Sequence, residues 1–307
     1  MGRKRIRDLR QQLVYTVNKN FKEGMDKHSI KKEGASNNTR IYTYSDRRNL
    51  IKFTSNISNF LKEKYPGIRL ATDIKSEHIQ AFLNLKAETC TKATIDQYVS
   101  KANKMQNLIN STYHSNNKLV LEIPKTEKEI YRDKQLSLEH YKMLRKSIKN
   151  ENALKAIECS KNFGLRVEDI SCLRKGDIDL KNKEINVIAS KGGRDRTVKL
   201  KTKEQLEVAE MLYNSKLALT ERIVPIKPDS INKALSRAME KLNIKEEYKK
   251  TGIHAIRKLY AQEEYNRCRN KGMSIEKSRA VVSKQLGHSE KRGKDDNLIK
   301  RYIKNLW

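Results

Sequence analysis

A histidine and an arginine lie one helical turn apart in the stretch HAIRK. His254 and Arg257 stand at positions i and i+3, so on a helix they share one face. Both side chains could bind one phosphate there, because a guanidinium donates paired hydrogen bonds that an ammonium cannot match. Taken alone, the pair could equally belong to a solvated polar face, so its chemistry depends on what the rest of the chain brings beside it.

A single tyrosine, Tyr302, follows the last histidine of the chain, His288. A phenol has an ordinary pKa of about 10 and is mostly protonated at neutral pH. Surrounding cations and a nearby base would make it a nucleophile. To catalyse phosphoryl transfer, a protein mainly has to position the reacting groups and neutralise charge on the non-bridging oxygens. Two guanidiniums, one or two imidazoles and a lysine meet that need without a metal ion.

Three further features offer groups of this kind. Arg166 follows the glycine that ends one predicted helix and precedes another, where backbone N–H groups also favour an anion, although a lone arginine there is usually a surface residue. Lys191 opens a Gly-Gly turn between two predicted strands, and neighbouring cations would lower its pKa and suit it to donate a proton. Arg194 and Arg196 near that turn leave a purely electrostatic phosphate clamp as the alternative. His288 ends the stretch QLGH.

The charge of the chain points to a polyanionic partner. Among 307 residues, 67 are Lys or Arg and 37 are Asp or Glu, a formal net charge of +30. Nucleic acid explains this excess best, and an anionic membrane surface is the alternative. No stretch approaches the roughly 18 apolar residues of a membrane span, and MGRKRIRDLR has no apolar signal-peptide core behind its charges. We therefore expect a cytoplasmic protein that does not act at a membrane.

The four cysteines form no CxxC pair, and the six histidines include no HExxH motif. This spacing predicts no disulfide, no zinc site and no other metal centre, so we expect no cofactor.

The elements that must position these groups divide into two domains. Apolar residues at steps of three and four predict helices from about Ser45, from Ser76 and from about Thr91. Residues 40–113 are therefore expected to form a helical bundle with basic faces. A basic N-terminal arm, residues 1–39, precedes it, and a polar linker, residues 114–135, follows it. Candidate DNA contacts on the third helix are Lys92, Lys101 and Lys104.

Residues 136–307 are expected to be mostly helical with one small antiparallel sheet. Gly164 should end a helix over 152–162, and EINVIAS (184–190) and TVKL (197–200) predict a β-hairpin. Further helices are expected near 203–219, 229–243, 254–269, 274–286 and 296–305.

The ordered set GLRVEDISCL, SKGGRDR, HAIRK, QLGH and a late tyrosine resembles the tyrosine recombinase (phage-type integrase) family. The resemblance covers residues 136–307, the catalytic domain of that family. The bundle over 40–113 is similar to its SAM-like core-binding domain. The resemblance implies a two-domain clamp around duplex DNA, and it implies cleavage and rejoining of strands through a 3′-phosphotyrosyl intermediate.

The resemblance also implies a role for each candidate. Arg166 and Arg257 would bind the scissile phosphate, and His288 would donate a hydrogen bond to it. Lys191 would be the general acid that protonates the leaving 5′ oxygen. The remaining roles are proton transfer by His254, attack by Tyr302 and orientation of the catalytic groups by the carboxylate of Asp169.

This sequence departs from the family pattern at two places. Lys258 stands where many members carry a second histidine, and the interval from His288 to Tyr302 is longer than usual. Tyr260 and Tyr265 are the other tyrosines near the HAIRK helix, and we expect them to be core or surface residues. Trp307 could be a minimal anchor on a neighbouring subunit.

The resemblance to this family implies one function, and two alternatives stay open. A site-specific recombinase would act as a homotetramer on two paired DNA sites, with an accessory DNA-bending or directionality factor as a further partner. It would serve integration and excision of a mobile element, or dimer resolution, in a bacterial or phage setting. The alternatives are a DNA-relaxing enzyme of the type IB topoisomerase class, which works as a monomer on any sequence, and a DNA-binding regulator without catalysis.

Overall fold

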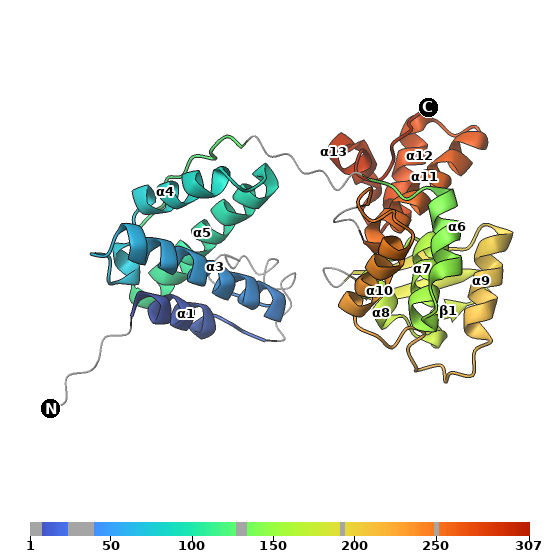
Figure 1. Ribbon diagram of the computed structural model, residues 1–307, viewed down its shortest axis with the longest axis horizontal. Helices are drawn as coiled ribbons and strands as arrows, with labels where there is room; N and C mark the ends of the chain where they lie inside the picture. Colours follow the sequence, from blue (N-terminus) through green and yellow to red (C-terminus); the bar gives the residue numbers. More distant parts are fainter. Residues whose placement is uncertain (1–7, 24–39, 127–133, 191–193, 249–251) are drawn as a thin grey trace. The chain divides into compact units, whose positions relative to one another are not determined.

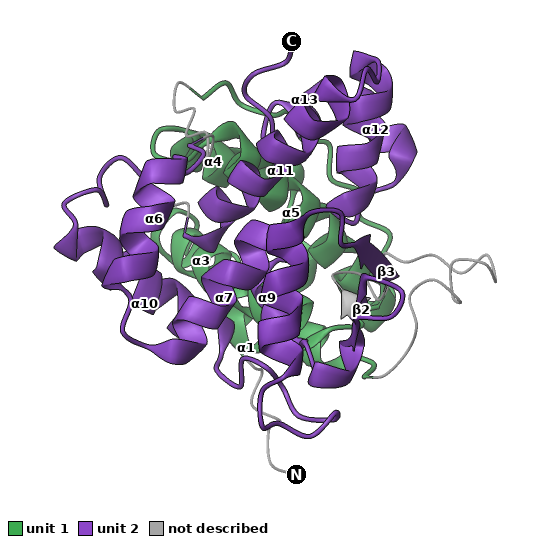
Figure 2. Cartoon of the chain, turned by 90° about the vertical axis from the view of Figure 1, so that its right-hand side faces the viewer, with its two compact units in different colours: residues 1–130 green, residues 131–307 purple. Residues whose placement is uncertain are grey.

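The computed structural model describes residues 8–23, 40–126, 134–190, 194–248 and 252–307. The chain divides into two compact units, residues 1–130 and residues 131–307 (Figures 1 and 2). Both are mainly helical, and the described strands all lie in the second unit, which confirms the expected fold class. No helix in the described ranges is long and apolar enough to cross a membrane.

The first unit is a helical bundle around an aromatic core. Its described helices are α1 (Leu9–Lys19), α3 (Tyr44–Lys64), α4 (Ser76–Ala87) and α5 (Lys92–Tyr113), with the 3-10 turn η2 (Ala71–Asp73). The rings of Phe53 and Phe60 pack edge-on against Phe82, and all three are buried. Such ring pairs contribute roughly 0.5–1.5 kcal/mol each beyond the apolar area that they bury.

Helix α1 corrects the expectation of an N-terminal arm for part of residues 1–39. Leu13 and Val17 are fully buried in the bundle. The Gln12 amide donates to the Arg69 carbonyl (2.9 Å) and accepts from the Ala71 backbone N–H (3.0 Å). Residues 9–19 therefore belong to the folded unit, because a short apolar stripe among the cations finds a place in the core. The rest of the expected arm, residues 1–7 and 24–39, lies outside the described residues.

The first part of the expected linker also packs against the bundle. The Val120 backbone N–H donates to the Ser76 hydroxyl (3.0 Å), and that of Glu122 donates to the Gln80 side chain (2.9 Å). Leu119 and Leu121 pack on the core of the first unit. The described residues 114–126 contain no strand.

The second unit combines helices with a three-stranded antiparallel sheet. The strands are β1 (Ile178–Asp179), β2 (Glu184–Ser190) and β3 (Arg194–Lys199), in the order β1-β2-β3. The expected hairpin is thus present, and β1 is an additional strand. The helices are α6 (Leu138–Ser147), α7 (Glu151–Phe163), α8 (Val167–Cys172), α9 (Lys203–Tyr213), α10 (Pro228–Lys241), α11 (Ile253–Asn270), α12 (Ile275–Gln285) and α13 (Asp296–Ile299), with 3-10 turns η3 (Lys175–Asp177) and η4 (Glu290–Lys294).

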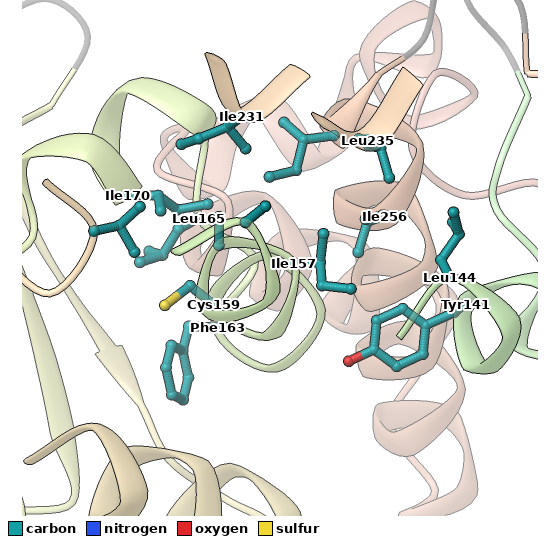
Figure 3. Close-up of a cluster of buried hydrophobic side chains, with 14 of the residues drawn as sticks. Tyr141, Leu144, Ile157, Cys159, Phe163, Leu165, Ile170, Ile231, Leu235 and Ile256 are labelled. Atoms are coloured by element: carbon teal, nitrogen blue, oxygen red, sulfur yellow. The ribbon is translucent and has the colours of Figure 1, made fainter. Parts of the chain in front are cut away.

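Helix α7 lies at the centre of the core of this unit (Figure 3). Its residues Ile157, Cys159 and Phe163 are fully buried, and the cluster includes Ile231 of α10 and Ile256 of α11. Burial of each large aliphatic side chain stabilises the fold by roughly 1.5–3 kcal/mol. This packing fixes α7 and α11, the two helices that precede Arg166 and carry Arg257.

The C-terminal segment is less helical than expected. The helix predicted over 296–305 ends at Ile299, and residues 300–307 form turns and irregular chain. The Gln262 side chain on α11 accepts from the backbone N–H groups of Lys304 (2.9 Å) and Asn305 (3.0 Å). The Trp307 indole donates to Asn266 of the same helix (3.3 Å). Helix α11 thus contacts residues 304–307 of its own chain, and an anchor of Trp307 on a neighbouring subunit stays a prediction.

Candidate active site

Two arginines from distant parts of the chain meet on one backbone carbonyl. Arg166 is the N-cap residue of the short helix α8, and Arg257 lies near the start of α11. The Leu286 carbonyl at the end of α12 accepts from Nη2 of Arg166 (3.0 Å) and from Nη2 of Arg257 (2.5 Å). The two guanidiniums are therefore held side by side on this carbonyl.

Arg257 is almost completely enclosed. Its side chain is 1% exposed, and Nη1 donates to the Gly164 carbonyl at the end of α7. Burial, more than any neighbouring charge, lowers its pKa to about 10. Arg257 therefore stays protonated at neutral pH, in surroundings that exclude water and strengthen its attraction for an anion.

Gly164 is required by backbone shape and by space. It ends α7 with φ +61°, and a Cβ on it would lie 2.4 Å from the ring of Tyr260. Tyr260 is 2% exposed, and burial raises its pKa above the ordinary value for a phenol. Of the two expected positions, core or surface, Tyr260 lies in the core, and its ring supports the glycine whose carbonyl accepts from Arg257.

Replacing Gly164 with alanine should lower both stability and cleavage. The left-handed backbone costs about 1–2 kcal/mol for a residue with a Cβ, and the contact with Tyr260 adds about 1–3 kcal/mol. Gly272 (φ +77°) is the matched control, because a Cβ on it would meet no atom within 4 Å. In urea denaturation, Gly164→Ala should lower the free energy of unfolding clearly more than Gly272→Ala does. Equal losses would mean that the Tyr260 contact is unimportant.

Asp169 is the carboxylate beside the arginines. Its side chain is 1% exposed, and Oδ2 accepts from the Arg166 backbone N–H (3.2 Å) and from Nη2 of Arg196 (2.8 Å). The Arg166 guanidinium lies 3.8 Å from the same oxygen. Asp169 therefore links Arg166 and Arg196, and its supporting role in catalysis stays a prediction.

Tyr302 lies among the expected catalytic groups. Its ring centroid is 5.2 Å from that of His254 and 5.9 Å from that of His288. The guanidinium carbon of Arg257 is 5.7 Å from the same centroid. Tyr302 is 8% exposed and packs with Leu286 and Ile299 in a small apolar cluster. The other nearby tyrosine, Tyr265, is fully buried, and its hydroxyl donates to the Trp307 carbonyl (3.1 Å).

His288 faces the arginines as a neutral imidazole. Burial, followed by the charges of Arg166 and Arg257, lowers its pKa to about 4. Its Nε2 is buried and has no hydrogen-bond partner within the described part of the chain. A neutral ring with an available nitrogen can bind a phosphate oxygen or the phenol when its tautomer suits.

The pKa of His288 predicts a pH-dependent contribution to stability. An unfolded histidine titrates near 6.5 and the folded one near 4, so the unfolded state binds the extra proton between these values. Stability is complete above pH 6.5 and falls on acidification toward pH 4, by about 1–2 kcal/mol for a half-buried ring. His288→Gln should flatten that part of the pH dependence in urea denaturation. Parallel curves for both proteins would contradict this assignment.

Four of the predicted DNA contacts have described side chains. Arg196 was expected as a phosphate contact near the hairpin turn, yet its side chain is 9% exposed and points inward to Asp169. Lys104 is paired with Asp46 (2.5 Å), so it is not a free cation on the face of α5. Lys101 lies 5.6 Å from the ring centroid of Tyr98. Lys92 is exposed at the start of α5.

The hairpin turn gives no test of two candidates. Lys191 lies outside the described residues, and of Arg194 only the backbone, as the first residue of β3, is described. Lys258, the departure from the family pattern, is buried at 1% exposure. The described residues hold no group of three or more His, Cys, Asp or Glu side chains suited to a metal ion.

Sequence reasoning missed the acceptors that orient the site. The carbonyls of Gly164 and Leu286 accept hydrogen bonds from the arginines. Because every residue type has a carbonyl, the only sequence signals for these acceptors were Gly164 itself and Gly287, which follows Leu286. Arg196 was noticed, but its inward direction depends on the register of the hairpin, in which Arg196 pairs with Val187.

Comparison with solved structures shows proteins of similar fold. The fold is similar to a lambda integrase dimer bound to a COC′ core site (TM-score 0.59, 18% identity, 90% of this chain and 92% of that chain). It is similar to the Tn1549 transposon integrase in complex with a circular intermediate DNA (TM-score 0.59, 14% identity, 95% of this chain and 95% of that chain). It is also similar to XerH site-specific recombinase bound to a palindromic difH substrate (TM-score 0.60, 15% identity, 93% of this chain and 89% of that chain).

At the level of sequence, no curated protein matches the chain closely enough to count as a relative. A family model does match it: the model of the phage integrase family covers residues 134–303, more than half of the chain. That range contains every described residue of the site, from Arg166 to Tyr302. The chain belongs to the phage integrase family, whose members are tyrosine recombinases.

Proposed function

We propose that this protein is a site-specific DNA recombinase that cuts and rejoins strands through a phosphotyrosyl intermediate. The observation that carries the proposal is the position of Tyr302, whose ring lies beside two histidines and the buried Arg257. A phenol in such surroundings can attack a phosphodiester, because the transition-state charge is stabilised in place.

The proposed reaction conserves the number of phosphoester bonds. The Tyr302 oxygen forms a bond to phosphorus, the bond from phosphorus to the 5′ oxygen breaks, and a 3′-phosphotyrosyl link results. His254 takes up the phenolic proton, and Lys191 gives a proton to the leaving 5′ oxygen. A 5′ hydroxyl from another strand then reverses these steps, so joining needs neither ATP nor a further oxidant or reductant.

Arg166, Arg257 and His288 bind the non-bridging oxygens in this proposal. The arginines already share the Leu286 carbonyl, and the His288 Nε2 has no protein partner in the described chain. A phosphate would replace or add to these contacts with little movement of the side chains. Such preorganisation lowers the barrier, because the site does not need to rearrange as charge develops.

The proposed partners are two paired duplex sites and further copies of this chain. Among the similar structures, a lambda integrase tetramer is bound to a Holliday junction (TM-score 0.58, 17% identity, 90% of this chain and 77% of that chain). The formal charge of +30 suits binding to several DNA phosphates. Mobile-element integration and excision, or dimer resolution, are the proposed tasks, with an accessory factor and a cytoplasmic location.

A comparison of two plasmids tests the proposal. One supercoiled plasmid carries two copies of a candidate site from the DNA that flanks the gene, and the other carries none. A recombinase should yield recombined products only from the first plasmid, without added metal. Relaxation of both plasmids without recombination would favour the type IB topoisomerase alternative. Tight binding without any cleavage would favour a non-catalytic regulator.

A further inference from the structure

Arg196 joins three parts of the site that are far apart in the sequence. It lies on β3, opposite Val187 of β2. Its Nη2 donates to Oδ2 of Asp169 (2.8 Å), the oxygen that also accepts from the Arg166 backbone N–H. A charged pair of this kind, with a carboxylate 1% exposed, is held in one geometry much more firmly than a surface pair.

The other side of Arg196 lies against the turn after α12. Gly287 has φ +72°, and a Cβ on it would lie 2.7 Å from Cδ and 2.9 Å from Nη1 of Arg196. The residue before this glycine, Leu286, supplies the carbonyl on which the two phosphate-binding arginines meet. The residue after it is His288. Arg196 therefore fills the space that Gly287, having no side chain, leaves open. This space lies next in the chain to the Leu286 carbonyl on one side and to His288 on the other.

We propose that Arg196 is a positioning residue for the scissile phosphate: it fixes Asp169 against the turn at Gly287 and thereby fixes the phosphate ligands on both sides. This inference rests on the proposed function. It gives Arg196 a role through its neighbours, whereas the sequence had suggested a direct contact with DNA.

The charges in the site support this role. Within the described residues, Arg166, Arg196 and Arg257 face the single carboxylate of Asp169, which leaves a net charge of +2. Arg196 lies close enough to lower the pKa of both Arg257 and His288. A phosphodiester carries one negative charge, and the transition state of attack by a phenolate carries two. Without Arg196 the carboxylate would compete with the phosphate for Arg166.

Single-turnover cleavage of a nicked duplex tests the inference with two variants. Arg196→Gln should cleave about 30- to 100-fold more slowly, because ligands displaced by about 1 Å lose that much rate. Arg196→Lys keeps the ion pair with Asp169 and should recover to within about tenfold of the unchanged protein. DNA affinity should change less than threefold for either variant. Lys199→Gln is the control, since this residue lies on the same strand with a half-exposed side chain paired to Glu184.

A methylphosphonate at the cleaved position separates positioning from simple folding. This neutral group needs less positive charge, so the deficit of Arg196→Gln relative to the unchanged protein should shrink at least tenfold. Should that variant not fold, Arg196→Lys carries the same comparison with a smaller deficit. Equal deficits on both substrates would overturn the inference and leave a structural role. Rescue instead by a 5′-bridging sulfur would also overturn it, because it would assign Arg196 to the leaving group.

The same experiment keeps the two proposals distinguishable. A covalent adduct from the unchanged protein supports the proposed function whatever the variants do. If Arg196→Gln then forms the adduct at the same rate, only the positioning role fails. If the unchanged protein forms no adduct on any site from its own genetic neighbourhood, the proposed function fails, and the positioning role fails with it.

Discussion

Tyr302→Phe should abolish DNA cleavage while leaving DNA binding intact. The substitution removes one oxygen and keeps the ring that packs against Leu286 and Ile299. Loss of a nucleophile costs at least about 10⁴-fold in rate, because the remaining groups can only stabilise a reaction that no longer has an attacking atom. Single-turnover cleavage of a nicked duplex measures the rate, and a gel-shift titration measures affinity, which should change less than threefold.

Two other tyrosines are the controls for this result. Tyr260 and Tyr265 lie in the same buried cluster as Tyr302. Their phenylalanine variants should cleave within about tenfold of the unchanged protein, since neither hydroxyl takes part in the reaction. Cleavage by Tyr302→Phe, together with its loss in either control variant, would place the nucleophile elsewhere on the chain.

Arg257→Lys should slow cleavage by about 10²- to 10³-fold, the usual cost of removing one donor to a developing oxyanion. The lysine keeps the charge but offers a single donor group in place of the fork that binds the carbonyls of Gly164 and Leu286. Since the Leu286 carbonyl keeps Arg166, the Gly164 carbonyl is the one that loses its partner, which lowers the free energy of unfolding by about 1–3 kcal/mol. Single-turnover kinetics and urea denaturation measure the two effects.

The comparison for this variant is Arg267→Lys on the same helix. Arg267 is partly exposed and pairs with Glu264, a contact that a lysine can keep. It should change cleavage and stability little. A rate for Arg257→Lys near that of the unchanged protein would show that charge alone is needed at this position. The carbonyl contacts would then have no role in the reaction.

Much of the helical framework could be predicted from the sequence, because most of the long helices carry an apolar stripe on one face. Helix α5 begins next to its predicted start at Thr91, and α11 agrees with its predicted range to within a few residues. Elements without such a stripe were missed or misjudged. Strand β1 has two residues, and the segment around Tyr302 owes its path to contacts with Gln262 rather than to its own periodicity.

The candidate residues were predictable because their order in the chain resembles that of a family. Their mutual distances were not, since Arg166 and Arg257 meet through the carbonyl of Leu286, which no side-chain pattern reveals. On the basic face of α5, the sequence did not show which lysines form ion pairs within the folded unit. Sequence counted Lys104 as available for DNA, whereas tertiary structure pairs it with Asp46, which lies far away in sequence.

The central claim is that Tyr302 becomes joined to DNA. A nicked duplex that loses its 5′-hydroxyl fragment would trap this intermediate, and mass spectrometry of the digested protein would identify the modified residue. We predict a nucleotide linked through its 3′ phosphate to the peptide that contains Tyr302, formed without added metal. A trapped adduct on any other residue, or one joined through a 5′ phosphate, would contradict the mechanism.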